Sequence, residues 1–180
     1  MAILITATAQ AEAEEKRKQG VRQVMDSLQM LIKKSGIQGI ELIPEQGVMR
    51  LKDTSFAKGS ACLDKRLQQL FKQDIAPIIQ QSMQADKGLA LQIEGHTDAI
   101  PVTSGSTNVS LTCALFDDNY TLSAGRAREA RKSLLSNIQA PEIIQRVSVV
   151  GYGPDRLLNQ DNPAAADNRR VEVRFVVNPS

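Results

Sequence analysis

The stretch GLALQIEGHTDAIPV, residues 88–102, joins a regular strand pattern to a long polar segment. Apolar and polar side chains alternate along its first half: Leu89, Leu91 and Ile93 against Gln92 and Glu94. An alternation with a period of two predicts a β-strand with one buried face. The pattern stops before Asp98, where a long polar segment begins. We therefore expect a strand that presents Asp98 at one edge of a sheet.

The segments upstream of this strand have clear periodicities of their own. Residues 9–34 carry apolar side chains at three- and four-residue steps and predict an amphipathic helix. Residues 40–43 and 48–51 flank the turn signal Pro-Glu-Gln-Gly and predict a β-hairpin. Residues 61–83 predict a core helix with a kink at Pro77. The first helix either packs on its own domain or pairs with a second copy of the chain.

The segments downstream begin with a long loop. Residues 99–118 are rich in Ser, Thr, Gly and Asn without a sustained period, and loops of this length are usually functional. Residues 119–138 predict a helix, whose first turn Thr121 or Ser123 can cap.

Two further strands complete the order of elements: RVSVVGYG at 146–153 and NRRVEVRFVV at 168–177. The helical crossovers imply parallel pairing, and the hairpin implies antiparallel pairing. We therefore expect an α+β fold, a two-layer sandwich in which a mixed β-sheet has helices packed on one face, preceded by the N-terminal helix.

The composition disfavours some classes of function. Lysine and arginine exceed aspartate and glutamate by only two, and aromatic residues make up 3%, so a basic surface with stacking rings for nucleic acid is not expected. No apolar run reaches the roughly 18 residues of a membrane helix. The short apolar patch at 3–5 is either the end of a membrane segment or part of an ordinary disordered terminus.

The single histidine, His96, lies between Glu94 and Asp98 at two-residue spacing, so an extended backbone would place all three on one face. A metal site would need further ligands, and the chain offers neither a second histidine nor a cysteine close in sequence. Acid/base catalysis would need two carboxylates at a matched distance, and nucleophilic catalysis would need a nucleophile beside its base. The sequence contains no motif for either arrangement. We therefore expect no metal, no cofactor and no enzymatic activity.

Asp98 and Arg126 are a better supported pair. Asp98 lies where the strand meets the loop, and Arg126 is expected in the first turn of the next helix, so the two ends of the loop can meet. The carboxylate and the guanidinium either pair with each other or face one ligand that carries both charges. A zwitterionic amino acid is such a ligand.

The two cysteines, Cys62 and Cys113, have the spacing of neither a CxxC redox pair nor a zinc ribbon. They form either one disulfide or two separate thiols. The compartment decides between these alternatives, because disulfides persist outside the cytoplasm.

Four blocks, in order, resemble the OmpA-like peptidoglycan-binding domain: IEGHTDAIPV (93–102), NYTLSAGRA (119–127), GYG (151–153) and NRRVEVRF (168–175). Together with FAKGSACL (56–63) upstream, these motifs are similar to those of the MotB-type branch of the family, whose members are the cell-wall anchors of ion-driven stator complexes. The resemblance covers residues 41–177. It implies a linker helix at 1–36, which a missing membrane segment would precede, and the binding domain at 37–180.

Resemblance to this family implies that the domain binds peptidoglycan in the periplasm without catalysing a reaction. Asp98 falls on the family's ligand-binding aspartate and Arg126 on its partner arginine, which hold the diaminopimelate of the stem peptide. Other motif positions help to build or line the pocket: Thr97, Asn119, Leu122 and Arg169. Leu122 can equally be a core leucine, and Arg170 should point to the opposite sheet face from Arg169. Glu94 and His96 are then interpreted as braces of the strand end.

The MotB-type resemblance also implies partners. These are peptidoglycan, a second copy in a homodimer, and a membrane-embedded subunit of a flagellar-type or Zorya-like defence motor, reached through an N-terminal span that tethers the domain to the inner membrane. The alternatives are the same domain in an outer-membrane protein or lipoprotein, and a dimerisation module with a degenerate pocket.

Two features depart from the family pattern. The segment between Asp98 and Arg126 is several residues longer and contains Cys113, so in the periplasm a Cys62–Cys113 disulfide would tie this loop to the start of the core helix. Ala57 stands where the OmpA branch often carries an acidic residue beside the pocket. A ligand contact there is lost or supplied by another residue.

Overall fold

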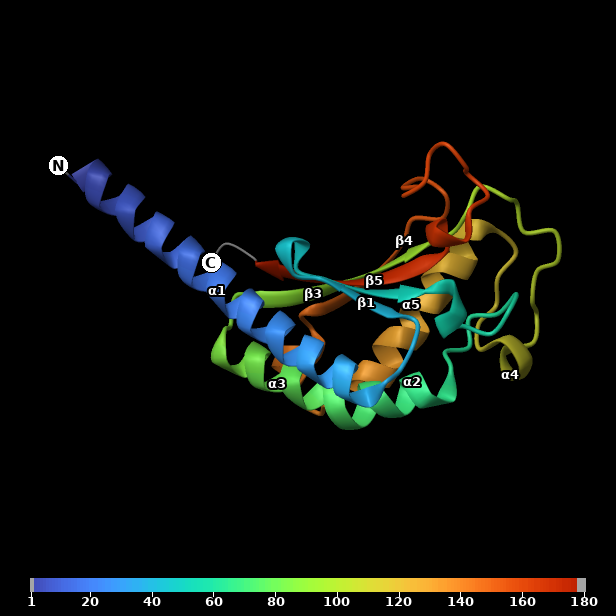
Figure 1. The fold of residues 1–180 in the computed structure, drawn as a ribbon, viewed down its shortest axis with the longest axis horizontal. Coiled ribbons are helices and arrows are strands. Elements are labelled where there is room, and N and C mark those ends of the chain that lie inside the picture. The colour runs from blue at the N-terminus through green and yellow to red at the C-terminus, as the bar shows by residue number, and fades with distance from the viewer. Residues whose placement is uncertain (1, 178–180) are drawn as a thin grey trace.

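The computed structural model describes residues 2–177 of the 180-residue chain, and it shows one sheet with helices on one face (Figure 1). The helices are α1 (Ala2–Ser35), α2 (Lys65–Leu70), α3 (Ala76–Ala85), α4 (Val109–Thr112), α5 (Asn119–Leu135) and α6 (Pro141–Ile144). The strands are β1 (Ile40–Ile43), β2 (Val48–Lys52), β3 (Leu89–His96), β4 (Val147–Gly151) and β5 (Arg170–Val177). Over the part of the chain described, no helix combines the length and hydropathy that a membrane span requires.

The sheet has the strand order β1-β2-β5-β3-β4. β1 pairs with β2, β2 with β5 and β5 with β3 in antiparallel fashion, while β3 and β4 are parallel. The helical segments between β2 and β3 and between β3 and β4 make the crossovers. The predicted mixed sheet with helices on one face is therefore confirmed.

The predicted core helix at 61–83 is divided by a wide turn. α2 passes into a π-helical turn at Phe71–Ile75, in which the Ala76 N–H bonds to the Phe71 carbonyl five residues back. α3 follows with Pro77 in its first turn, where a missing N–H is tolerated. The expected irregularity at Pro77 thus takes the form of a π-bulge before it.

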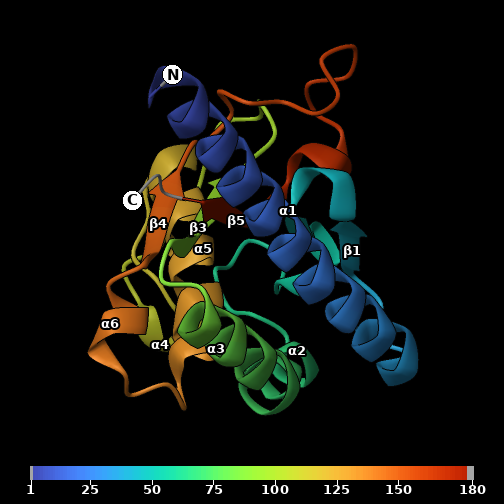
Figure 2. The same ribbon diagram turned by 90° about the vertical axis from the view of Figure 1, so that its left-hand side faces the viewer.

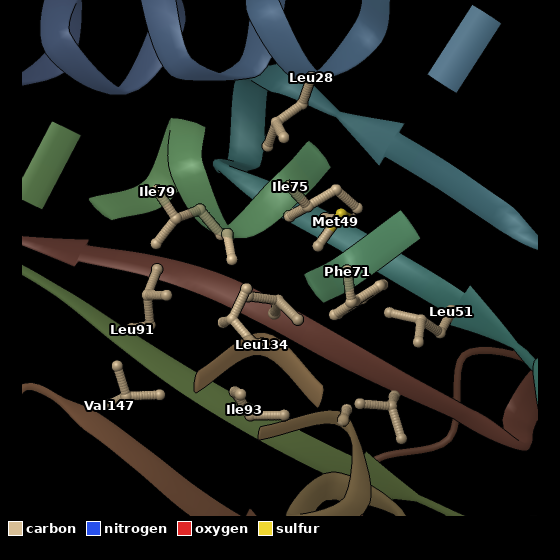
Figure 3. Close-up of a cluster of buried hydrophobic side chains, with 14 of the residues drawn as sticks. Leu28, Met49, Leu51, Phe71, Ile75, Ile79, Leu91, Ile93, Leu134 and Val147 are labelled. Atoms are coloured by element: carbon tan, nitrogen blue, oxygen red, sulfur yellow. The ribbon is translucent and has the colours of Figure 1, made fainter. Parts of the chain in front are cut away.

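The second half of α1 packs on its own domain. Val24, Met25 and Leu28 are buried in the same core cluster as Phe71 and Ile79. Figure 3 shows Leu28 in this cluster with Phe71 and Ile79. Residues 6–16 are exposed, and α1 projects beyond the sheet as one unbroken helix (Figures 1 and 2). The alternative of a disordered terminus is wrong from Ala2 onward, whereas pairing with a second copy and a domain boundary at residue 36 stay predictions.

α5 lies unusually close to the sheet at two paired glycines. Gly95 of β3 and Gly151 of β4 are direct partners in the parallel ladder. A Cβ at Gly95 would overlap the backbone carbonyl of Ser123, and one at Gly151 would lie 2.8 Å from the Tyr120 carbonyl oxygen. These glycines therefore fix the start of α5 against the ends of β3 and β4.

The substitution Gly95→Ala should lower the free energy of unfolding by about 1–3 kcal/mol, because the helix must move to admit the methyl group. Urea denaturation measures this loss. Gly20→Ala is the matched control: nothing lies within 4 Å of a Cβ there, and alanine favours the helix by up to about 1 kcal/mol. A Gly95→Ala protein with the wild-type midpoint would contradict the close packing.

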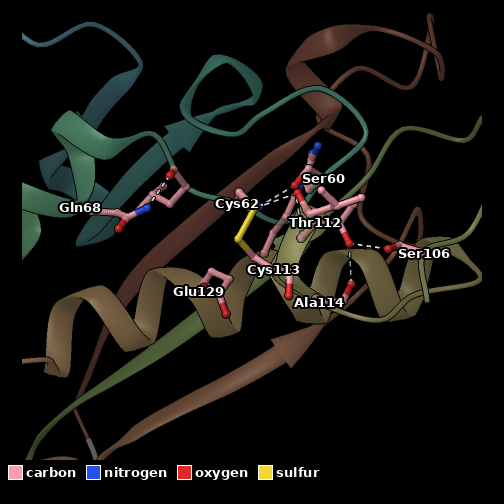
Figure 4. The surroundings of a disulfide bond; sticks show 12 residues. Ser60, Cys62, Gln68, Ser106, Thr112, Cys113, Ala114 and Glu129 are labelled. Atoms are coloured by element: carbon pink, nitrogen blue, oxygen red, sulfur yellow. Dashed lines mark hydrogen bonds between the residues drawn. A yellow bond between two sulfur atoms is a disulfide. The ribbon is translucent and has the colours of Figure 1, made fainter. Parts of the chain in front are cut away.

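Cys62 and Cys113 form a disulfide, which confirms the predicted pairing (Figure 4). Next to it, the Ser60 hydroxyl and the Ala61 N–H both donate to the Thr112 carbonyl, at 3.2 and 3.0 Å. The predicted loop at 99–118 contains α4 and is tied by these bonds to the segment before α2.

Replacing both cysteines by serine should cost about 4 kcal/mol of unfolding free energy, since the disulfide closes a loop with a sequence separation of 51. Thermal and urea unfolding of the variant measure this cost. Reduction of the wild type should reproduce it. Equal stabilities of oxidised and reduced protein would show that the bond does not restrain the unfolded chain.

Candidate ligand-binding site

Asp98 lies just beyond the end of β3. The ribbon shows that β3 ends far from the N-terminal part of α1 (Figure 1). Its Oδ1 accepts the Ile100 N–H at 2.9 Å. The Thr97 hydroxyl donates to the Asp98 carbonyl at 2.9 Å, and the Thr97 N–H donates to the Gly153 carbonyl. Asn119 donates to the Ile100 carbonyl at 3.0 Å. Thr97 and Asn119 therefore hold the backbone that carries Asp98.

Arg126 lies further along α5 than predicted. Asp118 caps the helix: its side chain accepts the Thr121 N–H at 2.7 Å, while the Thr121 hydroxyl accepts the Asp118 N–H at 3.2 Å. The prediction of Thr121 or Ser123 as the cap is wrong, because Asp118 has the extended backbone and the free carboxylate that an N-cap needs. Arg126 consequently lies about two turns inside the helix and not in its first turn.

The Arg126 side chain is held in a fixed position. Its Nε donates to the Ser60 carbonyl at 2.9 Å, and its guanidinium lies 5.2 Å from the centre of the Phe56 ring. Burial lowers the pKa of Arg126, and the neighbouring Asp53 carboxylate acts in the opposite direction. Because Ser60 adjoins the disulfide segment, that segment also positions Arg126.

Asp98 and Arg126 do not pair with each other among the contacts of the described chain. Arg126 Nη1 lies 3.3 Å from Asp53 Oδ1, and Arg169 Nε lies 3.0 Å from Asp53 Oδ2. Arg169 forms a second ion pair with Asp98 through Nη1. The result is a chain of alternating charges in the order Arg126, Asp53, Arg169, Asp98.

Asp53 belongs to the candidate site, although its sequence context does not predict this. It lies in a short 3₁₀ turn after β2, far in sequence from Asp98, and no motif or spacing singles it out. The available signal was strand pairing: β2 aligns Lys52 with Arg170, which brings Asp53 next to Arg169. Ala57 is exposed, and the expectation that a ligand contact there is lost or supplied by another residue stays a prediction.

The other residues singled out from the sequence lie on both sides of the sheet, and a groove opens near them. Arg170 points to the other sheet face from Arg169, as predicted, and bonds there to Glu172. Leu122 is 9% exposed and lies outside the main core cluster. A groove of about 820 Å³ opens beside the charge chain, and its walls include Glu41, Arg50, Lys52, Asp53, Leu158 and Arg169.

A second polar cluster is buried on the sheet face away from the helices. Glu94 and Glu172 are direct partners across β3 and β5, an arrangement that is unfavourable for two like charges. Three arginines offset it: Arg50 and Arg170 contact Glu172, and Arg174 contacts both glutamates. The His96 ring stacks on Tyr152 at 5.4 Å.

Glu94, His96 and Glu172 could hold a metal ion by spacing, since one ligand atom from each lies within 4.8 Å of the others. Both His96 nitrogens lack a hydrogen bond to a described residue, and Nε2 lies 3.5 Å from Glu94 Oε2. The carboxylates, however, are already engaged by three guanidinium groups, whose charge opposes a cation. The cluster therefore fits an ionic brace of the sheet better than a metal centre.

Residues 55–170 match the OmpA family. The chain belongs to the OmpA family. Within the match lie Asp98, Arg126 and Arg169, whereas Asp53 precedes it. No curated protein sequence matches the chain.

Solved structures place this OmpA-family chain among MotB-like folds. A putative MotB-like protein from Desulfovibrio vulgaris is 20% identical with a TM-score of 0.65, and the alignment covers 92% of this chain and 99% of that one. The periplasmic domain of Helicobacter pylori MotB (residues 78–256) is 23% identical with a TM-score of 0.56, covering 78% and 82%. At these identities the likeness shows a shared fold.

The buried cluster should make the stability of this OmpA-family domain depend on pH. Burial would raise the pKa of Glu94, but the His96 ring, whose Nε2 lies 3.5 Å from Glu94 Oε2, and the hydrogen bonds donated by Arg174 outweigh burial and lower the pKa from 4.5 to about 2. Burial lowers the pKa of His96 below 6.5. Both groups have a higher pKa in the unfolded chain, so the unfolded chain binds protons at a higher pH than the folded domain does. Their contribution to the free energy of unfolding is therefore present above pH 6.5 and is lost as the pH decreases.

We therefore expect the urea midpoint to fall below about pH 6.5 because of His96, and further between pH 4.5 and 2 because of Glu94. His96→Gln should remove the first decrease and keep the second. Identical midpoints from pH 7 to pH 4 in the wild type would contradict the assigned protonation states.

Proposed function

We propose that this chain is a periplasmic domain that binds peptidoglycan without catalysis and anchors a membrane-associated complex, an ion-driven stator, to the cell wall. The observation that carries the proposal is the pair of buried, opposite charges at one end of the sheet, Asp98 and Arg126, whose ion-pair partners Asp53 and Arg169 line a groove. Membership of the OmpA family and the MotB-like fold support it.

The chemistry of the pair suits diaminopimelate, whose free end carries an ammonium and a carboxylate. In the proposed complex Asp98 accepts the ammonium, and the Arg126 guanidinium forks onto the carboxylate. Thr97 and Asn119 keep Asp98 in place, while Leu122 and Arg169 lie around the bound group. Both anchors are buried, so their charges are screened less by water than surface charges would be.

The position of α1 supports an anchoring role. Its N-terminus points away from the site (Figure 1), so a membrane-embedded partner and the cell wall could be held at opposite ends of the molecule. Its exposed residues 6–16 offer a surface for a second copy of the chain in a homodimer. The flagellar-type and Zorya-like defence motors are both compatible with this arrangement.

Retention on purified peptidoglycan sacculi tests the proposal. Asp98→Asn and Arg126→Ala should each reduce retention by about tenfold or more, because each removes a charge-assisted contact from the ligand. Arg128→Ala is the matched control, since its guanidinium is on the same helix but 59% exposed and should not contact the ligand.

Circular dichroism checks that the variants are folded. Equal retention of all four proteins would refute the site assignment. A folded wild type that is not retained would favour a dimerisation module with a degenerate pocket.

A further inference from the structure

An internal ion pair separates the groove from the two buried anchors. Asp53 and Arg169 line the groove, and each of their side chains is 31% exposed. The side chains of Arg126 and Asp98 are 4% and 8% exposed. A ligand that enters the groove therefore meets Asp53 and Arg169 first.

This internal pair repeats the charge order of an amino-acid zwitterion. Next to Arg126 comes the Asp53 carboxylate, then the Arg169 guanidinium, and then Asp98. A ligand held between Arg126 and Asp98 presents the same order, a carboxylate followed by an ammonium. The ligand and the internal pair consequently compete for the same two partners.

We propose that Asp53 is a displaceable internal competitor of the ligand: its carboxylate occupies the position in front of Arg126 that the ligand's carboxylate takes. The inference rests on the proposed function, since it takes the ligand to be the zwitterionic end of diaminopimelate. On binding, Asp53 leaves Arg126 and Arg169 leaves Asp98, and both side chains turn into the groove. Partly exposed ion pairs are weak, so a ligand can replace them.

The competitor also confers specificity. A ligand with a carboxylate and an ammonium satisfies both Arg126 and Asp98 when the internal pair leaves. An amidated ligand cannot replace the Asp53 carboxylate, because displacement would leave the buried Arg126 guanidinium without a counter-charge. The internal pair therefore favours ligands that carry both charges.

Calorimetric titration of the whole 180-residue chain tests the competitor. The probes are a stem tripeptide ending in diaminopimelate with a free side-chain carboxylate and the same tripeptide with that carboxylate amidated. Asp53→Asn should bind the free-carboxylate peptide with a Kd about two- to tenfold lower than the wild type, because the competing state is weakened. The amidated peptide should show no such gain.

Asp161→Asn is the matched control: Asp161 lines the same groove and makes no ion pair to a described residue, so its loss reports only the general effect of removing a negative charge. Asp53→Ala, checked for folding by circular dichroism, should change the Kd in the same direction as Asp53→Asn.

The outcomes separate the two proposals. If the wild type binds neither peptide, the proposed function fails and the competitor role fails with it. If the wild type binds and Asp98→Asn abolishes binding, but Asp53→Asn binds equally or more weakly, only the competitor role is refuted. A gain matched by Asp161→Asn refutes it as well.

Discussion

The start of α5 rests on two paired glycines of β3 and β4, Gly95 and Gly151. Without side chains at Gly95 and Gly151, the backbone of Ser123 and Tyr120 can rest directly on β3 and β4. The same contact lies between Asp98, beyond the end of β3, and Arg126, about two turns into α5. The separation of the two anchors is thus set by backbone packing, which deforms far less than side-chain contacts.

Much of this architecture could be predicted from local patterns. Alternation identified β3, and three- and four-residue steps identified α1, because each of these signals lies within one element. The positions of Asp98 and Arg126 at the two ends of the long loop singled them out as a candidate pair, and the family resemblance then supported that choice. Asp53 could not be found in this way, since its role arises only when β2 lies beside β5. The π-bulge before Pro77 and the Asp118 cap depend on local backbone geometry that periodicity does not encode.

The two groups of charges in this domain contrast in exposure. Around Glu94 and Glu172, both carboxylates are buried and bonded to several arginines, so a single side chain cannot leave without exposing a buried charge to an apolar environment. In the chain from Arg126 to Asp98, the two middle members reach solvent and the two ends do not. The cluster around Glu94 and Glu172 therefore suits a rigid sheet. The charge chain from Arg126 to Asp98 suits an exchange of ion-pair partners.

The unbroken helix α1 can transmit a pulling force from its N-terminal end to the domain. A helix of 34 residues is about 51 Å long, and the second half of α1 packs on the domain, against α3, β1, the turn at Pro44–Gln46 and the π-helical turn at Phe71–Ile75. Tension applied at its N-terminus would pass along the helix axis and load the interlocked side chains of Val24, Met25 and Leu28 in shear. Many contacts would then share the force at once, so the domain would resist a sustained pull better than one held by a flexible tether.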